Sequence, residues 1–294
     1  MDASFPTAGA RAQYSSALKR FLESSRNFEV LTSVARDGQS RPPSTTTTST
    51  TDGVLLYVLD SSFNPPTLAH RHIACSAVLE NWGKPSRLLL LLATQNADKP
   101  AKPASFEDRL IMMQLCAQDL LAFLESRIPP ADKHLLPVVD IGVTKKPYFV
   151  DKAAAIDAAG VYPQSLEQVH LTGYDTLIRI FDTKYYPPDH TLAPLEPFLS
   201  KHRLRVTVRP DSDWGSKAEQ EAYLADLAQG GRESEGGKRE WAQKIRLVEG
   251  NKHKKQSISS TKAREAIQMN PQDLDWLVPA KVRDFVLSEQ PYSE

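Results

Sequence analysis

The feature that most constrains the fold is an alternation of short apolar runs with stretches of helical periodicity, which begins at residue 54. Several of the apolar runs are almost continuous Leu and Val, as is typical of parallel strands covered by helices on both faces. The runs lie at 54–60, 87–93, 137–143, 167–172, 204–209 and 244–249. This alternation predicts an α/β fold with a Rossmann-like, doubly wound parallel sheet.

The clearest helix between these runs is predicted over 105–124. Ser105 can cap its N-terminus, and Asp108 completes a capping box. An apolar stripe along one face supports the same prediction, formed by Met113, Ala117, Leu120, Leu121 and Leu124. Glycine and charge content predict an exposed loop at 230–240.

The first 53 residues have a different character. Residues 15–25 predict a short amphipathic helix with Leu18, Phe21 and Leu22 on one face, and 28–34 predict a strand. Residues 36–53 carry a Ser/Thr run without periodicity, which favours a mobile loop or linker. A phosphorylated tail is the alternative interpretation. We therefore divide the chain into an extension, 1–53, and a main domain, 54–294.

Charge and cysteine content exclude several classes of protein. Lys plus Arg and Asp plus Glu are both 36, so the chain lacks the basic excess of a protein that grips nucleic acid or an anionic membrane. The longest apolar stretch, Leu88 to Ala93, is far short of the ~20 residues that span a bilayer, and the N-terminus has no apolar core of a secretory signal. Cys75 and Cys116 form no CxxC and no disulfide framework, which indicates a reducing compartment, cytoplasm or nucleus, and excludes structural zinc.

The most informative segment follows the first apolar run, from Leu59 to His70, and reads LDSSFNPPTLAH. Its two prolines predict a tight connection that opens a helix. His70 then lies in the first turn, where free N–H groups and a partial positive charge suit a phosphate. In a doubly wound sheet this is also where ligands bind. The plain alternative is a proline turn with an incidental surface histidine; His72 faces away and is interpreted as a surface residue.

A second segment, Gln256 to Arg264, reads QSISSTKAR and follows the last apolar run. Hydroxyl side chains at a helix start can cradle a polyphosphate. Arg264 lies about one turn in and can reach the same anion. The alternative is a capped helix behind a solvated lysine run, Lys252, Lys254 and Lys255, that serves as a nuclear-import patch.

The two segments together, in this order, resemble the signatures of the nucleotidyltransferase superfamily, Gly-Ser-Phe-Asn-Pro-x-[His/Thr]-x-x-His and Ile-Ser-Ser-Thr-x-x-Arg. Ile258 to Arg264, and Thr67, are similar to the nicotinamide mononucleotide adenylyltransferase branch in particular. Ser61 to Pro66 resembles a divergent fungal branch. The resemblance covers about 54–292, and it includes a Gly-x-Asp element, Gly173 to Asp175, and a C-terminal segment, Trp276 to Pro279 with Val282 and Phe285.

This resemblance implies that the 5′-phosphate of nicotinamide mononucleotide attacks the α-phosphorus of ATP, which gives NAD and pyrophosphate. It implies that His70 and Arg264 are catalytic. The residues implied to bind ATP are Ser61, Ser62, Phe63, His70, Gly173, Asp175, Ile258, Ser259, Ser260, Thr261 and Arg264. Those implied for the acceptor nucleotide are Ser62, Phe63, Lys99 and Lys102. Mg²⁺ is expected on the ATP oxygens, without a dedicated metal site in the protein.

The chain departs from the family pattern in three places. Ser61 replaces a glycine, which alters the close backbone approach to phosphate. The lysine-bearing loop is loosely matched by 96–102, so Lys99 and Lys102 are alternatives. The tryptophans that stack on nicotinamide have no clear match, and the candidate substitutes, each with packing as its alternative, are Tyr148, Phe149, Tyr185, Tyr186 and Trp214.

These departures leave other functions open. In one alternative, the acceptor is nicotinate mononucleotide or another phosphorylated compound. In a second, the chain is a catalytically weak nucleotide-binding protein with a regulatory role. A third, nucleic-acid binding, depends only on the basic run at 252–264. The oligomeric state is not predicted.

Overall fold

The computed structural model describes residues 7–43, 54–95, 104–163, 165–208, 214–250 and 258–293. The strands are β1 (Phe28–Val34), β2 (Ser40–Arg41), β3 (Leu55–Asp60), β4 (Ser86–Ala93), β5 (Val138–Thr144), β6 (Glu167–Gly173), β7 (Arg203–Val208) and β8 (Ile245–Glu249). They form one eight-stranded sheet in the order β2-β1-β5-β4-β3-β6-β7-β8. Each of the apolar runs predicted to be a strand is a strand.

The sheet from β5 to β8 is parallel throughout. Counted along the chain from β3, its order is the 3-2-1-4-5-6 arrangement of doubly wound folds. The predicted fold class is therefore confirmed. The order reverses between β3 and β6, and a crevice forms at such a switch point, outside the carboxyl ends of the strands.

The helices are α1 (Thr7–Glu23), α2 (Leu68–Glu80), α3 (Phe106–Glu125), α4 (Phe149–Ala158), α5 (Tyr174–Ile180), α6 (Glu196–Lys201), α7 (Lys217–Gln229), α8 (Ser260–Met269), α9 (Leu274–Leu277) and α10 (Ala280–Glu289). Short 3₁₀ turns lie at Pro130–Leu135, Thr183–Tyr185, Ala193–Leu195, Glu233–Glu235, Arg239–Lys244 and Pro271–Asp273. Ser105 caps α3 as predicted, because its hydroxyl accepts the Asp108 backbone N–H at 3.1 Å. The apolar stripe of α3 is buried.

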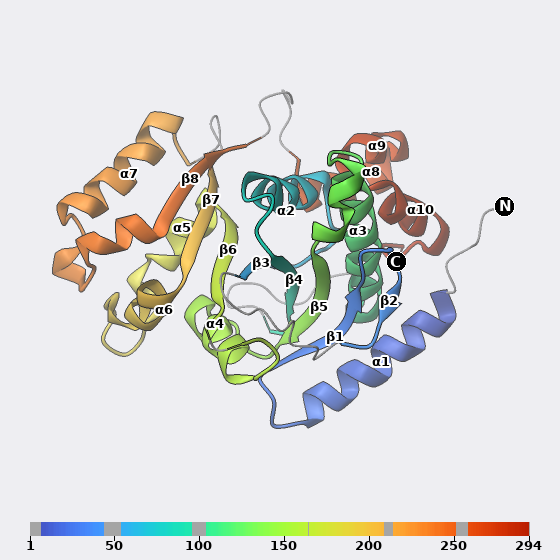
Figure 1. The fold of residues 1–294 in the computed structure, drawn as a ribbon, viewed down its shortest axis with the longest axis horizontal. Helices are drawn as coiled ribbons and strands as arrows, with labels where there is room; N and C mark the ends of the chain where they lie inside the picture. Colours follow the sequence, from blue (N-terminus) through green and yellow to red (C-terminus); the bar gives the residue numbers. More distant parts are fainter. Residues whose placement is uncertain are drawn as a thin grey trace.

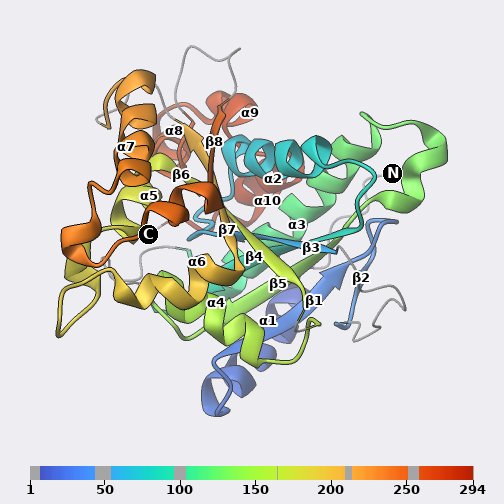
Figure 2. The ribbon, with the colours of Figure 1, turned by 60° about the vertical axis from the view of Figure 1, so that its left-hand side comes forward.

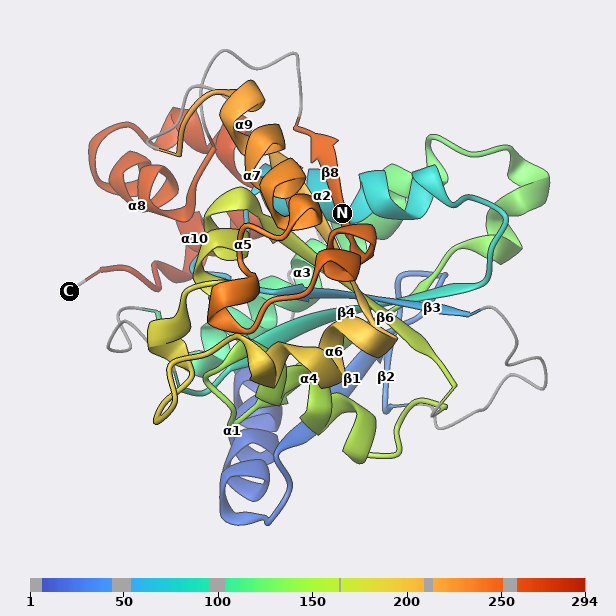
Figure 3. The same cartoon turned by 90° about the vertical axis from the view of Figure 1, so that its left-hand side faces the viewer.

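Alternate residues of β3 point to opposite faces of the sheet, and each face has its own core. Tyr57 and Leu59 pack with α2, α3 and α8 to α10 in the larger core. Leu56 and Val58 pack instead with Ala155 and Ile156 of α4. Figure 1 shows the two groups of helices on either side of the sheet, and Figure 3 shows α2 and α4 on opposite sides of β3 and β4.

The N-terminal residues join the sheet rather than standing beside it. β1 pairs antiparallel with β5 next to α1 (Figure 2), and it has the predicted bounds. α1 is longer than predicted; Leu18 and Phe21 are buried, whereas Leu22 is 49% exposed and does not belong to the packed face. The division of the chain at residue 53 stays a prediction, and the Ser/Thr run at 44–53 lies outside the described residues.

Part of the segment predicted as a mobile loop is ordered. β2 pairs with β1 through Ser33 and Arg41, and Thr32 Oγ1 donates to the Arg41 carbonyl at 2.9 Å. A two-residue strand has no periodicity, so the sequence pattern could not predict it. The loop predicted at 230–240 is largely exposed, and Gly230 at φ 96° ends α7 in the left-handed conformation that favours glycine.

In the part of the chain that the structure describes, no helix is both long enough and apolar enough to cross a membrane. Cys75 and Cys116 are free thiols, both buried.

Candidate functional site

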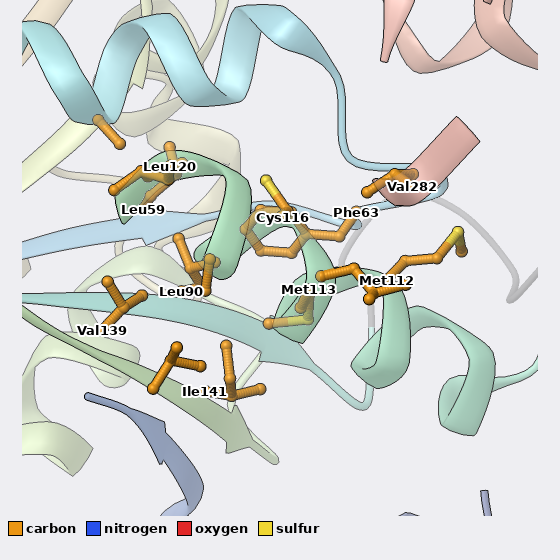
Figure 4. Close-up of a cluster of buried hydrophobic side chains, with 14 of the residues drawn as sticks. Leu59, Phe63, Leu90, Met112, Met113, Cys116, Leu120, Val139, Ile141 and Val282 are labelled. Carbon is orange, nitrogen blue, oxygen red and sulfur yellow. The ribbon is translucent and has the colours of Figure 1, made fainter. Parts of the chain in front are cut away.

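The first signature segment forms the connection between β3 and α2, at the carboxyl edge of the sheet. Ser62 is exposed there, whereas the Phe63 side chain is fully buried beside Cys116 and Val282 (Figure 4). The Phe63 side chain therefore cannot contact a ligand, and only its backbone can take part in binding. Its φ of 45° lies in the left-handed region, where a bulky residue is strained by about 1–3 kcal/mol. Strain of this kind clusters at ligand sites.

His70 lies in the first turn of α2, as predicted, and its ring is held at both nitrogens. The Thr67 backbone N–H donates to His70 Nδ1 at 2.9 Å, in a capping box. Since Nδ1 accepts that bond, the neutral ring carries its proton on Nε2. Nε2 lies 2.9 Å from Ser61 Oγ. The serine that replaces the family's glycine thus contacts the predicted catalytic histidine.

The second signature segment forms the N-terminus of α8 and contacts the first directly. Arg264 Nη1 donates to the Asn64 carbonyl at 2.6 Å, and Ser260 Oγ donates to the Pro65 carbonyl at 2.8 Å. Ser259 Oγ accepts the Lys262 N–H, so Ser259 is also a helix cap. Thr261 Oγ1 accepts from Arg264 Nη2 at 3.3 Å, and Ile258 packs partly buried against the core. The fold therefore brings α2 and α8 to one loop by their N-termini, which are anion-binding positions.

A cavity of about 380 Å³ lies next to this loop, on the α4 face of the sheet. Its volume is within the ~300–1,000 Å³ range of small-molecule sites. Its walls come from the ends of β3 and β4, from α4 and α5, and from the 3₁₀ turn after α5: Asp60, Ser61, Ser62, Ala93, Pro147, Tyr148, Phe149, Lys152, Asp175, Thr176, Arg179, Ile180, Tyr185 and Tyr186. The cavity occupies the switch point between β3 and β6.

Four of the predicted aromatic candidates line this cavity, but in two different roles. Tyr148 and Tyr185 face each other with ring centroids 6.5 Å apart and planes tilted by 57°. Phe149 packs on His170 at 4.8 Å between ring centroids. Burial raises the pKa of Tyr186, whose hydroxyl donates to the Ile180 carbonyl at 2.5 Å. Tyr148 and Tyr185 are thus the rings available to a ligand, and the other two pack. Trp214 is outside the lining.

Gly173 caps α5, and Asp175 follows in its first turn and lines the cavity. The predicted Gly-x-Asp element therefore reaches the same place as Ser61 and Ser62. The C-terminal segment has a packing role, because Val282 is fully buried in the larger core and Phe285 nearly so.

Two predictions about histidine and lysine had different outcomes. His72 is not a surface residue: it is half-buried, and burial, with the nearby charge of Arg205, lowers its pKa. Arg205 of β7 reaches across to Ser76, in the next turn of α2, and a sequence pattern cannot show that contact. Lys99, Lys102, Lys252, Lys254 and Lys255 lie outside the described residues.

Sequence reasoning missed a pair of charged residues in the cavity wall. Lys152 Nζ lies 2.5 Å from Asp60 Oδ2, and the two side chains are only 11% and 19% exposed. Asp60 ends an apolar strand, and Lys152 lies in the first turn of α4 beside Asp151. A charge at the end of a buried strand is a signal that could have found Asp60.

The described residues can therefore hold an anion at the helix N-termini and a flat ring against the tyrosine pair, and the Ser61–Pro66 loop lies between these two places. No group of three or more His, Cys, Asp or Glu side chains among them is arranged to hold a metal ion. Fold and site together define a doubly wound α/β protein of the nucleotidyltransferase class.

No protein-family model matches the chain. It is 34% identical over 238 residues, 81% of this chain and 86% of the relative, to the Schizosaccharomyces pombe protein named "Putative nicotinamide mononucleotide adenylyltransferase". The chain thus belongs to the nicotinamide mononucleotide adenylyltransferase family.

Solved structures of Plasmodium falciparum nicotinic acid mononucleotide adenylyltransferase are more remote. The complex with NaAD matches with 13% identity and a TM-score of 0.47, over 81% of this chain and 96% of the other. The complex with APC matches with 14% identity and a TM-score of 0.48 over the same shares. At these values the matches define no substrate for this chain.

Proposed function

We propose that the protein transfers the adenylyl group of ATP to the 5′-phosphate of nicotinamide mononucleotide, with NAD and pyrophosphate as products. The observation that carries the proposal is the position of the Ser61–Pro66 loop between two different sites. On one face of the sheet the loop contacts Arg264 and Ser260 of α8. On the other face Ser61 and Ser62 line the cavity with the paired tyrosines.

This arrangement suits a reaction between two nucleotides. The N-termini of α2 and α8 favour the triphosphate of ATP, because a helix start presents backbone N–H groups and a positive dipole end. The tyrosine rings favour a flat base, and Asp175 offers a carboxylate to a ribose hydroxyl. With the base on the α4 face, the acceptor phosphate comes to the exposed Ser62 and meets the α-phosphate of ATP across the loop.

The transfer needs no covalent intermediate and no general base. A phosphate oxygen of the acceptor forms a bond to the α-phosphorus of ATP, and the bond from that phosphorus to the pyrophosphate oxygen breaks. The acceptor phosphate is already ionised at neutral pH, so no proton has to leave the nucleophile. Orientation of the two phosphates and stabilisation of charge are then the main contributions of the protein.

His70 and Arg264 supply that stabilisation in our proposal. His70 Nε2 carries the ring proton and can transfer its hydrogen bond from Ser61 Oγ to a phosphate oxygen. Arg264 keeps donors of its guanidinium for the β- and γ-phosphates while Nη1 holds the Asn64 carbonyl. Mg²⁺ bound to ATP would neutralise phosphate charge, and phosphate oxygens with water can supply its ligands without a carboxylate cage.

The test is turnover of the full chain with Mg-ATP and nicotinamide mononucleotide, with NAD and pyrophosphate measured separately. Equal amounts of both products are expected. His70→Ala should lower turnover by roughly 10²–10³-fold, because one preorganised donor to the transition state is lost. His134→Ala is the control, since His134 is exposed on a 3₁₀ turn and bonds only to the Ala131 carbonyl among the described residues.

Two results would contradict the proposal. Binding of Mg-ATP without formation of either product would favour a nucleotide-binding regulatory protein. If His70→Ala forms product at the wild-type rate, His70 has no catalytic role. Nicotinate mononucleotide and other phosphorylated acceptors belong in the same assay, because a higher kcat/KM for one of them would change the acceptor.

A further inference from the structure

We infer that Asp60 and Lys152 together recognise the carboxamide of the acceptor and select it over the corresponding carboxylate. This inference rests on the proposed function, because it concerns the acceptor of that same reaction. It assigns a role in specificity to two residues that neither signature segment includes.

The first step of the argument is the position of the pair. Asp60 is the last residue of β3, on the α4 face, and Lys152 lies on α4, three residues after Phe149. Both side chains line the cavity that Tyr148 and Tyr185 also line. A ring packed against these tyrosines therefore lies in the same cavity as the ion pair, and its substituent can reach the pair.

The second step is the hydrogen-bonding capacity that the pair leaves unused. Lys152 Nζ has three N–H donors and makes one bond, to Asp60 Oδ2. Among the described residues, Asp60 Oδ1 accepts no hydrogen bond. Elsewhere in this sheet, Asp140 uses both carboxylate oxygens, with bonds from Arg87, Ser33 and Tyr162. A buried ion pair by itself adds little stability, so unused capacity beside a cavity indicates a ligand.

The third step is the chemistry of the two possible substituents. A carboxamide has an NH₂ donor and a carbonyl acceptor on one carbon, which match a carboxylate acceptor and an ammonium donor held side by side. A carboxylate has two acceptor oxygens and a negative charge. It can accept from Lys152, but Asp60 repels it and is left with an unused lone pair. Discrimination of this kind depends on a repulsive element as well as an attractive one.

The other charges around the cavity do not supply this match. Asp175 and Arg179 lie on α5, and Arg179 is exposed at the rim. Among the described residues, neither Asp175 nor Arg179 has a partner of opposite charge at hydrogen-bond distance, whereas Asp60 and Lys152 have each other. Together the four charges cancel, so the cavity as a whole does not favour an anionic base over a neutral one.

The experiment compares kcat/KM for nicotinamide mononucleotide and nicotinate mononucleotide in the full chain and its variants. The wild type should prefer the amide by at least about tenfold, because the acid leaves a buried polar group unpaired. In Asp60→Asn the repulsion is gone, and the added amide can donate to a carboxylate, so the preference should fall by about tenfold or reverse. Lys152→Gln should change it in the opposite direction, since only the acid depends on the positive charge.

Asp37→Asn is the matched control, because Asp37 also pairs with a cation, Arg41, but is half exposed and far from the cavity. A wild type that prefers the acid, or an Asp60→Asn variant with an unchanged preference, would overturn the inference. If Asp60→Asn does not fold, as judged from its melting curve, the Lys152→Gln ratio decides alone. Failure of the proposed function looks different: the wild type then forms neither dinucleotide, whichever acceptor is supplied.

Discussion

The two ends of the central sheet both contain a carboxylate paired with a cation, yet Asp140 is fully buried and Asp60 is only partly buried, and the two pairs differ in what surrounds them. At the amino end, Asp140 is fully buried and accepts from Arg87 at 3.0 and 2.8 Å, from Ser33 at 2.6 Å and from Tyr162 at 2.8 Å. At the carboxyl end, Lys152 is the one hydrogen-bond donor to the Asp60 carboxylate among the residues that the structure describes, and the pair borders a cavity. A buried charge with every oxygen satisfied holds a fold together, whereas one with spare capacity beside a cavity is available to a ligand.

Loss of the carboxylate at the amino end should have the largest effect. Asp140→Ala leaves the guanidinium of Arg87, whose side chain is 22% exposed, without its partner, and it leaves the Tyr162 hydroxyl unpaired. The expected loss is about 3–5 kcal/mol in the free energy of unfolding. Urea denaturation measures it, with the exposed Asp37→Ala as control. A loss below about 1 kcal/mol would remove the distinction between the two ends.

At the carboxyl end, the largest effect should appear in ligand binding and not in folding. Arg264→Ala should weaken Mg-ATP binding by about 1.5–3 kcal/mol, because a charge-assisted hydrogen bond to phosphate is lost. Arg264→Lys keeps the charge without the planar fork and should be impaired as well. The measurement is the thermal shift with and without saturating Mg-ATP. Arg283→Ala, on the exposed side of α10, is the control, and an unchanged shift in Arg264→Ala would exclude Arg264 as a phosphate ligand.

A third prediction uses pH to probe the histidines that lie behind the cavity. Burial holds the pKa of His170 well below its ordinary value, and burial also lowers that of His202, although Asp157 opposes the change. Above about pH 7.5 both rings are almost entirely neutral in the folded and unfolded states, because the ordinary pKa of histidine is about 6.5. Below that pH, the two histidines bind protons in the unfolded chain but not in the folded one, so the free energy of unfolding decreases as the pH is lowered.

The expected loss between pH 7.5 and pH 5.5 is about 1 kcal/mol for His170 alone. Urea denaturation at the two pH values, in wild type and in His170→Gln, isolates this share, and the exposed His134→Gln should behave as wild type. The same pH dependence in His170→Gln and in wild type would show that His170 is not held neutral.

The smallest expected effect tests the comparison most directly. Asp60→Asn should lower the free energy of unfolding by less than Asp140→Asn does, because the amide oxygen can still accept from Lys152 and the ammonium borders a cavity. The melting temperature of this variant, beside that of Asp140→Asn, gives the contrast. A loss for Asp60→Asn as large as that for Asp140→Asn would mean that both ends of the sheet are structural.

Much of the fold could be predicted because its signals are local. The strands appear as apolar runs, and the caps of α3 and α8 appear as Ser105 and Ser259 before helical periodicity. Features without a periodic signal were missed, such as β2, or given the wrong environment, such as Leu22 and His72. The site was predicted in two halves, each from its own signature segment. The contact between Lys152 and Asp60 could not be predicted.

The sequence by itself determined the main strands, the fold class and the positions of His70 and Arg264 near the N-termini of their helices, because periodicity and capping act between residues a few positions apart. The tertiary structure alone decided which distant groups meet. Arg264 reaches Asn64 across 200 residues of chain, and Lys152 reaches Asp60 across 92. The order of the strands sets both contacts, since it places β3 at the switch point with α8 on one face and α4 on the other. A polar side chain becomes structural or functional according to the neighbours that this order supplies.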